Sequence, residues 1–286
     1  MSASPPVRPH RTTKANPALT PTSFSHQRAI PSNPKTLLLT TYLVAYNVLS
    51  AAGWFLVLYR TLAHLLSIAH AQARPRRLPP RKPQKGEPPA LARLVPFYLR
   101  ACTTYDAVGE TTARVQTVAV LEILHVLLGL VRSPLPTTAV QVASRLFSVW
   151  GIAARFPSAQ RSPFYASMVF SWALTEVIRY TFYAASLVRW EPALLLWARY
   201  STFFVLYPTG AGSEALVNLA TLPFSVATGG SWFSALPLSH WDAFALLRGL
   251  LFIAWWPGLY PMYAHMIKQR RKVYAGQKLG ARPKTH

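Results

Sequence analysis

The sequence has few acidic residues: 8 Asp and Glu stand against 30 Lys and Arg, for a net charge of +22. In a soluble protein such a surplus would indicate nucleic-acid binding. Only 13% of the residues are charged, however, about half the roughly 25% of a soluble domain. The basic residues gather in three stretches, 1–36, 60–114 and 268–286, which flank long apolar runs. This placement favours membrane lipid over nucleic acid as the partner, because basic flanks bind anionic headgroups and set topology.

Cysteine, glycosylation sequons and an N-terminal leader are also scarce or missing. Cys102 is the single cysteine, which excludes an intramolecular disulfide and a zinc site built on cysteines. No Asn-x-Ser/Thr sequence occurs, so glycosylation cannot report which side of a membrane a loop faces. No apolar core precedes Leu37, so the sequence predicts no cleavable signal peptide, and we expect the first apolar run to direct insertion.

Six apolar runs are present instead, and helices of about 20 such residues cross a bilayer. The sequence therefore predicts an all-α polytopic membrane protein, a bundle of six transmembrane helices. The predicted spans are 37–59, 115–131, 135–154, 164–188, 193–222 and 243–267. Within a membrane domain at 37–272 we expect a long basic, proline-rich connector at 60–114 and an interfacial loop at 223–241; basic tails occupy 1–36 and 273–286.

Topology follows from the span count and the charges. An even count places both termini on one side, and the basic run Lys-Gln-Arg-Arg-Lys after the last span makes that side cytosolic. The basic connector 60–114 would then be luminal, against the positive-inside rule, although long connectors obey that rule poorly.

Three of the acids, Glu122, Glu176 and Glu214, fall inside apolar runs, where an ionised group is costly and a functional role is the first hypothesis. Glu122 and His125 share a helical face. They could act as general acid and base, or as a buried pair that meets Arg145 or another basic group. A di-iron site would need a second Glu-x-x-His, and none occurs, so no metal is predicted.

A second polar stripe lies in the fourth run. Glu176, Arg179, Tyr180 and Tyr183 follow one another at offsets of three, four and seven, so they lie on one helical face. Glu176 and Arg179 can neutralise each other within the helix. The pattern predicts a structural ion pair, with pocket lining as the alternative.

The fifth run carries the richest pattern. Tyr207 and Glu214 are seven residues apart and so share a face about two turns apart. Pro208, Gly210 and Gly212 between them would allow the helix to bend or unwind. The residues alone leave two interpretations open: a phenol–carboxyl pair for proton transfer, or a kinked packing helix with small residues at a close contact.

Taken together, these segments resemble the 3-hydroxyacyl-CoA dehydratases of very-long-chain fatty acid elongation, which are also called protein-tyrosine-phosphatase-like proteins. The resemblance is carried by YLVAYNVLSAAGW, LEILHVLLGLVRSPLPTTAVQVASR, SWALTEVIRYTFY, RYSTFFVLYPTGAGSE and PGLYPMYAHMIKQRRK, in that order. Its most specific part is the motif Y-P-x-G-x-x-S-E, which is complete from Tyr207 to Glu214. A phosphatase Cys-x5-Arg loop would need arginine at 108, where Val108 stands.

The resemblance implies that Tyr207 and Glu214 are catalytic, and that Arg199, Gly210 and Arg132 support them. It also implies an endoplasmic reticulum membrane, a long-chain 3-hydroxyacyl-CoA substrate without a cofactor, and other elongation enzymes as partners. Two rivals are a catalytically inactive scaffold of the elongation complex, which would have lost the tyrosine or the glutamate, and a transporter. A transporter should show internal repeats, and none is found.

Overall fold

The computed structural model describes residues 34–66, 89–190, 192–223 and 241–280, and these are helical, with no strand among them. The predicted all-α class is therefore confirmed for the described chain. The helices in order are α1 (Pro34–Leu66), α2 (Pro89–Ala101), α3 (Thr104–Val118), α4 (Val120–Leu127), α5 (Leu135–Leu146), the π-helix η2 (Phe147–Ala153), α6 (Pro157–Gln160), α7 (Pro163–Leu187), α8 (Ala193–Ser201), α9 (Phe203–Leu219) and α10 (Ala243–Gly280).

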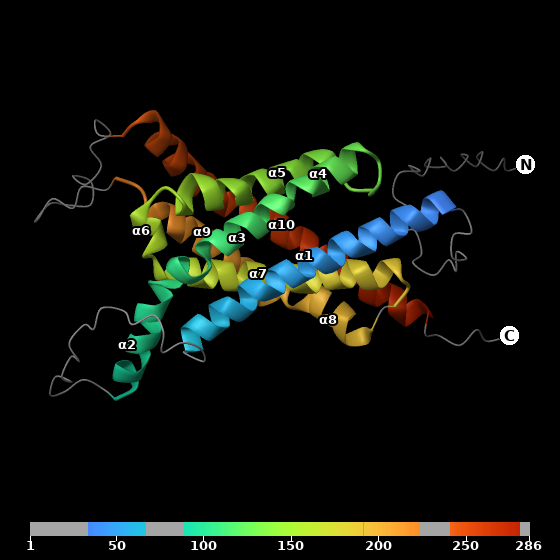
Figure 1. The fold of residues 1–286 in the computed structure, drawn as a ribbon, viewed down its shortest axis with the longest axis horizontal. Helices are drawn as coiled ribbons and strands as arrows, with labels where there is room; N and C mark the ends of the chain where they lie inside the picture. Colours follow the sequence, from blue (N-terminus) through green and yellow to red (C-terminus); the bar gives the residue numbers. More distant parts are fainter. Residues whose placement is uncertain (1–33, 67–88, 191, 224–240, 281–286) are drawn as a thin grey trace, which may run out of the picture.

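Most of these helices lie side by side along the long axis of the molecule (Figure 1). Three pairs join end to end into longer rods: α3 with α4, α5 with η2, and α8 with α9. With α1, α7 and α10 they make six rods in the part of the chain that the structure describes. α7 packs against both α1 and α9 and so lies at the centre. The start of α1 and the end of α10 lie at the same end of the bundle (Figure 1).

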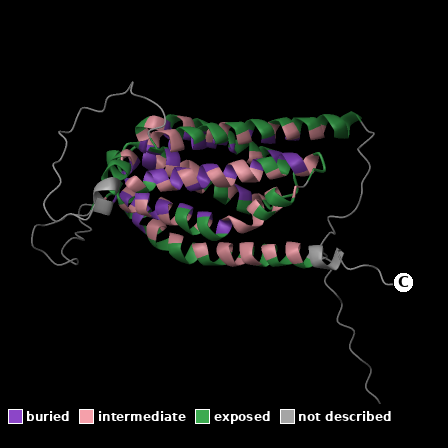
Figure 2. Cartoon of the chain, turned by 90° about the horizontal axis from the view of Figure 1, so that it is seen from below, coloured by how far each residue is buried: buried purple, intermediate pink, exposed green. Residues whose placement is uncertain are grey.

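Burial is concentrated where the rods face one another, and the outer faces are exposed (Figure 2). The core gathers large apolar side chains from α1, α3 and α7, including Trp54, Val108, Tyr165 and Met168. Many exposed side chains are apolar as well, for example Leu38, Leu49, Phe55, Leu250 and Ile253. A large apolar exterior is what a surface in contact with lipid requires.

Two helices are long and apolar enough to cross a membrane, by length and composition: Pro34–Leu66 and Ala243–Ala275. The predicted count of six spans remains a prediction. The helices that form the three joined rods have between 7 and 17 residues each, so none of them alone has a span's length. α7 has 25 residues, but it carries Glu176 and Arg179 at its centre.

The predicted connector at 60–114 differs from the observed structure at both ends. α1 continues through Arg60 to Leu66, and α3 begins at Thr104. Three charged residues in this part of the predicted connector, Asp106, Glu110 and Arg114, recur every fourth residue and are all exposed. Val108 and Thr112 are buried on the opposite face, so this segment is an amphipathic helix packed on α1.

Two further expectations concern the C-terminal part. α10 extends to Gly280, well past Ile267 and into the predicted basic tail. The expected interfacial loop at 223–241 lies outside the described residues, apart from its two end positions. The tails at 1–33 and 281–286 and the proline-rich centre of the connector also lie outside them.

Candidate active site

The α7–α9 contact is the part of the bundle that positions the predicted catalytic residues. Small side chains bring the two helices together: a Cβ placed on Gly210 would lie 3.3 Å from Ser171 Cβ and 3.7 Å from Trp172 Cδ1. Two hydroxyl contacts join the same faces, Ser171 to Thr209 at 3.1 Å and Ser213 to Ser167 at 2.9 Å. Gly210 is buried here, as a residue that permits close packing should be.

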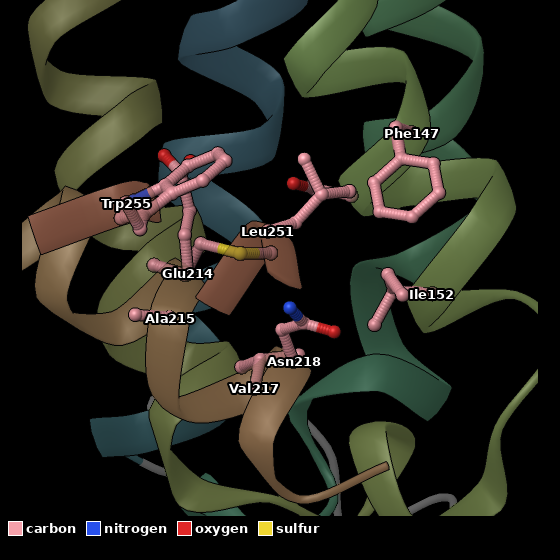
Figure 3. A pocket seen from close by; sticks show the side chains of 10 residues that line it. Phe147, Ile152, Glu214, Ala215, Val217, Asn218, Leu251 and Trp255 are labelled. Carbon is pink, nitrogen blue, oxygen red and sulfur yellow. The ribbon is translucent and has the colours of Figure 1, made fainter. Parts of the chain in front are cut away.

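Glu214 projects from α9 beside an internal cavity of about 10 Å3, room for about one water molecule. Figure 3 shows the cavity between α9, which contributes Glu214 and Asn218, and η2, which contributes Phe147 and Ile152. Met168, Leu251 and Trp255 complete much of an apolar lining. The Glu214 carboxyl accepts a hydrogen bond from the indole N–H of Trp172 on α7. An acid is thus held among apolar groups, where charge interactions are strong.

Tyr207 stands two turns before Glu214 on the same helix. α9 remains helical from Phe203 to Leu219 with Pro208 inside it, so it does not unwind there. The two residues are therefore about 10 Å apart along the helix axis. The Tyr207 ring packs against Tyr263 of α10 at 6.2 Å between ring centroids. Its hydroxyl makes no hydrogen bond within the described chain, so it can bind a substrate.

Beside this site runs a chain of ion pairs that joins three helices. Arg145 of α5 binds Glu176 of α7, and Arg179 Nε donates to the other oxygen of Glu176 at 2.6 Å. Arg179 also donates two hydrogen bonds to Glu122 of α4, at 2.7 and 3.1 Å. The predicted intrahelical pair of Glu176 and Arg179 is confirmed. Since two arginines meet two glutamates, the chain is neutral.

Glu122 and His125 make no hydrogen bond with each other; each binds a different partner. Glu122 accepts hydrogen bonds from Arg179 and from the Tyr180 hydroxyl. His125 is buried, and its Nε2 lies 2.8 Å from the hydroxyl of Tyr42 on α1. Glu122 meets a basic group other than Arg145, namely Arg179, which one interpretation of the sequence allowed, whereas His125 meets Tyr42. No group of three or more metal-ligating side chains occurs among the described residues.

The two predicted supporting arginines lie in different places. Arg199 on α8 donates to the Tyr183 hydroxyl at 3.1 Å, at the end of the polar stripe on α7. Arg132 is exposed in the turn between α4 and α5. The arginine of this hairpin that reaches the site is Arg145, whose guanidinium lies over the Trp172 ring at 5.1 Å from its centroid.

Sequence reasoning missed Trp172 as a site residue. It stands four positions before Glu176 and so extends the polar stripe of α7 by one turn. That spacing was the available signal, but an isolated tryptophan in an apolar run is ordinarily core. Only the packing of α7 on α9 shows that its N–H meets a carboxyl.

The fold and the site define a class: a chain that is helical in its described part, with apolar outer faces, two helices fit to cross a membrane, and a partly buried carboxyl beside a cavity. This class is the helical membrane protein with an internal polar site. Within it, the family described as protein tyrosine phosphatase-like protein, PTPLA, matches residues 116–276. The chain belongs to that family.

Curated relatives agree along most of the chain. It is 35% identical over 241 residues to the very-long-chain (3R)-3-hydroxyacyl-CoA dehydratase PASTICCINO 2B of Oryza sativa, covering 83% of this chain and 94% of the relative. It is 34% identical over 239 residues to the human very-long-chain (3R)-3-hydroxyacyl-CoA dehydratase 2, covering 82% of each. A probable dehydratase of the same name from Schizosaccharomyces pombe is 45% identical over 161 residues, 56% of this chain and 71% of the relative. No solved structure matches the chain.

Proposed function

We propose that this protein is a hydro-lyase that removes water from a (3R)-3-hydroxyacyl-CoA to give a trans-2-enoyl-CoA, the third step of very-long-chain fatty acid elongation. The observation that carries the proposal is the environment of Glu214. Its carboxyl lies beside a mainly apolar cavity and on the same helix as Tyr207, in a chain whose relatives are named as dehydratases of this substrate class.

The chemistry requires two proton-handling groups. The C2–H bond breaks, its electron pair forms the C2=C3 double bond, the C3–O bond breaks, and the hydroxyl leaves as water after gaining a proton. The thioester acidifies the C2 proton, so a carboxyl and a phenol suffice without a cofactor. We assign Glu214 as the acid–base group and Tyr207 as the hydrogen-bonding partner of the substrate hydroxyl. The substrate would lie between the two side chains, which reach toward it from positions about 10 Å apart along α9.

We propose six membrane crossings, one for each rod. All six rods are roughly 27 Å or longer at about 1.5 Å per residue, near the ~30 Å of a hydrocarbon core. An even number of crossings agrees with the start of α1 and the end of α10 lying at one end (Figure 1). We place that end in the cytosol and the protein in the endoplasmic reticulum membrane. The basic residues of that end would hold the CoA phosphates, and other elongation enzymes would be its partners.

Two alternative functions, an inactive scaffold and a transporter, agree less well with the sequence. An inactive scaffold would not need both Tyr207 and Glu214, and the chain retains both. A transporter predicts repeated halves in the sequence, which are missing.

The test is conversion of a long-chain 3-hydroxyacyl-CoA by the purified protein and its variants. Tyr207→Phe and Glu214→Gln should each lower turnover at least about a hundredfold, since a proton-transfer group is worth ~10²–10⁴ in rate. Matched controls are Tyr260→Phe and Glu110→Gln, because both side chains are exposed and far along the sequence from the motif. The controls should keep the wild-type rate. Near-wild-type turnover in either motif variant would remove that residue from the mechanism, and Glu122 and His125 would be tested next.

A further inference from the structure

Trp172 has a contact that its role as a core residue does not explain. Its ring is 3% exposed, and its indole N–H donates to Oε1 of Glu214 across the α7–α9 contact. Within the described chain this is the only hydrogen bond that Glu214 makes. The orientation of the proposed acid–base group therefore depends on one donor from a neighbouring helix.

The donor itself is held in place by its surroundings. The guanidinium of Arg145 covers the ring at 5.1 Å from the centroid, and Arg145 is bound in turn by Glu176. On the α9 side, the ring edge lies next to Gly210, where a Cβ would be in van der Waals contact at 3.7 Å from Trp172 Cδ1. These contacts hold the indole N–H toward the carboxyl.

An indole nitrogen can donate but cannot accept a hydrogen bond. Oε1 of Glu214 is therefore occupied as an acceptor, and the better acceptor of a protonated carboxyl is its carbonyl oxygen. We propose that Trp172 is a positioning residue, which fixes the Glu214 carboxyl and leaves Oε2 to exchange the proton with the substrate. This inference rests on the proposed function and adds a division of roles between the two carboxyl oxygens.

The experiment must separate the N–H from the ring. Trp172→Phe keeps an aromatic face under Arg145 and removes the donor. Replacement by benzothienylalanine keeps the two-ring shape and exchanges the N–H for sulfur, so it preserves packing even where phenylalanine leaves a gap. Both should lower kcat about three- to tenfold, the range for losing one hydrogen bond to a neutral acceptor. KM should stay within about threefold, because the indole does not touch the substrate.

Trp150→Phe is the matched control. The Trp150 indole N–H also donates across a helix contact, to Thr117 Oγ1 at 3.0 Å, but its side chain is half-exposed and does not line the cavity beside Glu214. Its loss should leave kcat and KM unchanged. All variants are compared as purified full-length protein with thermal unfolding measured beside turnover.

The coupling to Glu214 is tested in the double variant. If Trp172 acts through the carboxyl, adding Trp172→Phe to Glu214→Gln should cost less than about twofold more, since the two act as a unit. An equal loss in both backgrounds, or wild-type kcat in the benzothienylalanine protein, overturns the positioning role while the proposed function stands. Wild-type turnover in Glu214→Gln, or no turnover by the unaltered protein, overturns both.

Discussion

Glu176→Ala tests how much the ion-pair chain stabilises the bundle. The Glu176 side chain is 3% exposed and binds two arginines whose side chains are 26% and 21% exposed. Removing it leaves Arg145 without a carboxylate partner in the described structure, whereas Arg179 keeps Glu122. Breaking a buried pair from one side costs about 3–5 kcal/mol, and the retained Glu122 puts the expected loss near the lower limit, about 3 kcal/mol. For a chain of this size that lowers Tm by roughly 10 °C.

The assay is thermal unfolding of the purified protein in detergent. Glu110→Ala is the matched control, since Glu110 pairs with Arg114 at 77% and 74% side-chain exposure and should matter by less than about 1 kcal/mol. The double variant Arg145→Met with Glu176→Met should recover part of the loss, because it leaves no unpaired charge. If Glu176→Ala unfolds at the same temperature as Glu110→Ala, the chain does not stabilise the fold. If it keeps its Tm and loses turnover, Glu176 belongs to the active site.

Two further outcomes are expected. Gly210→Ala should lower turnover several-fold and Gly210→Val much more, because a Cβ 3.3 Å from Ser171 Cβ is a tight contact that requires a shift at the α7–α9 interface, and the two further methyl groups of valine enlarge that shift. Gly258→Ala, with nothing near its Cβ position, is the control, and equal rates in Gly210→Val and wild type would contradict the close-packing role. Epitope tags at the two ends of the chain should both be digested by protease added to sealed microsomes, and protection of either tag would rule out an even number of crossings with cytosolic ends.

What the sequence could predict was what lies within a single helix. The stripe of Glu176, Arg179 and Tyr180 follows from helical periodicity, and the structure confirms its intrahelical ion pair. The positions of Tyr207 and Glu214 on one face of one helix follow in the same way, although their catalytic roles stay predictions. Periodicity fixes neighbours along a helix because the backbone geometry is the same in every helix.

Partners across helices could not be predicted in this way. The sequence left the basic partner of Glu122 open between Arg145 and another group. That partner is Arg179, and Arg145 lies at Glu176, because which helices touch depends on the packing of the whole bundle. For the same reason, the hydrogen bond from Trp172 to Glu214 could not be predicted from the sequence. The helix that begins at Thr104 does have a signal in the sequence, because Asp106, Glu110 and Arg114 recur every fourth residue, as on the exposed face of an amphipathic helix. The predicted connector at 60–114 did not use that spacing.

The chain of ion pairs has a consequence for the order in which the protein is made. In the helices of the α4–α5 hairpin Glu122 balances Arg145, with the exposed Arg132 in the turn between them, and within α7 Glu176 balances Arg179. In the proposed topology, the hairpin would enter the bilayer before α7 has been synthesised. When α7 packs against the hairpin, Arg179 forms an ion pair with Glu122, and Arg145 forms one with Glu176. Docking of α7 exchanges partners without leaving any of these four charges unpaired. In a nascent chain that stalls before α7, the acid and the arginine within the hairpin helices still balance each other.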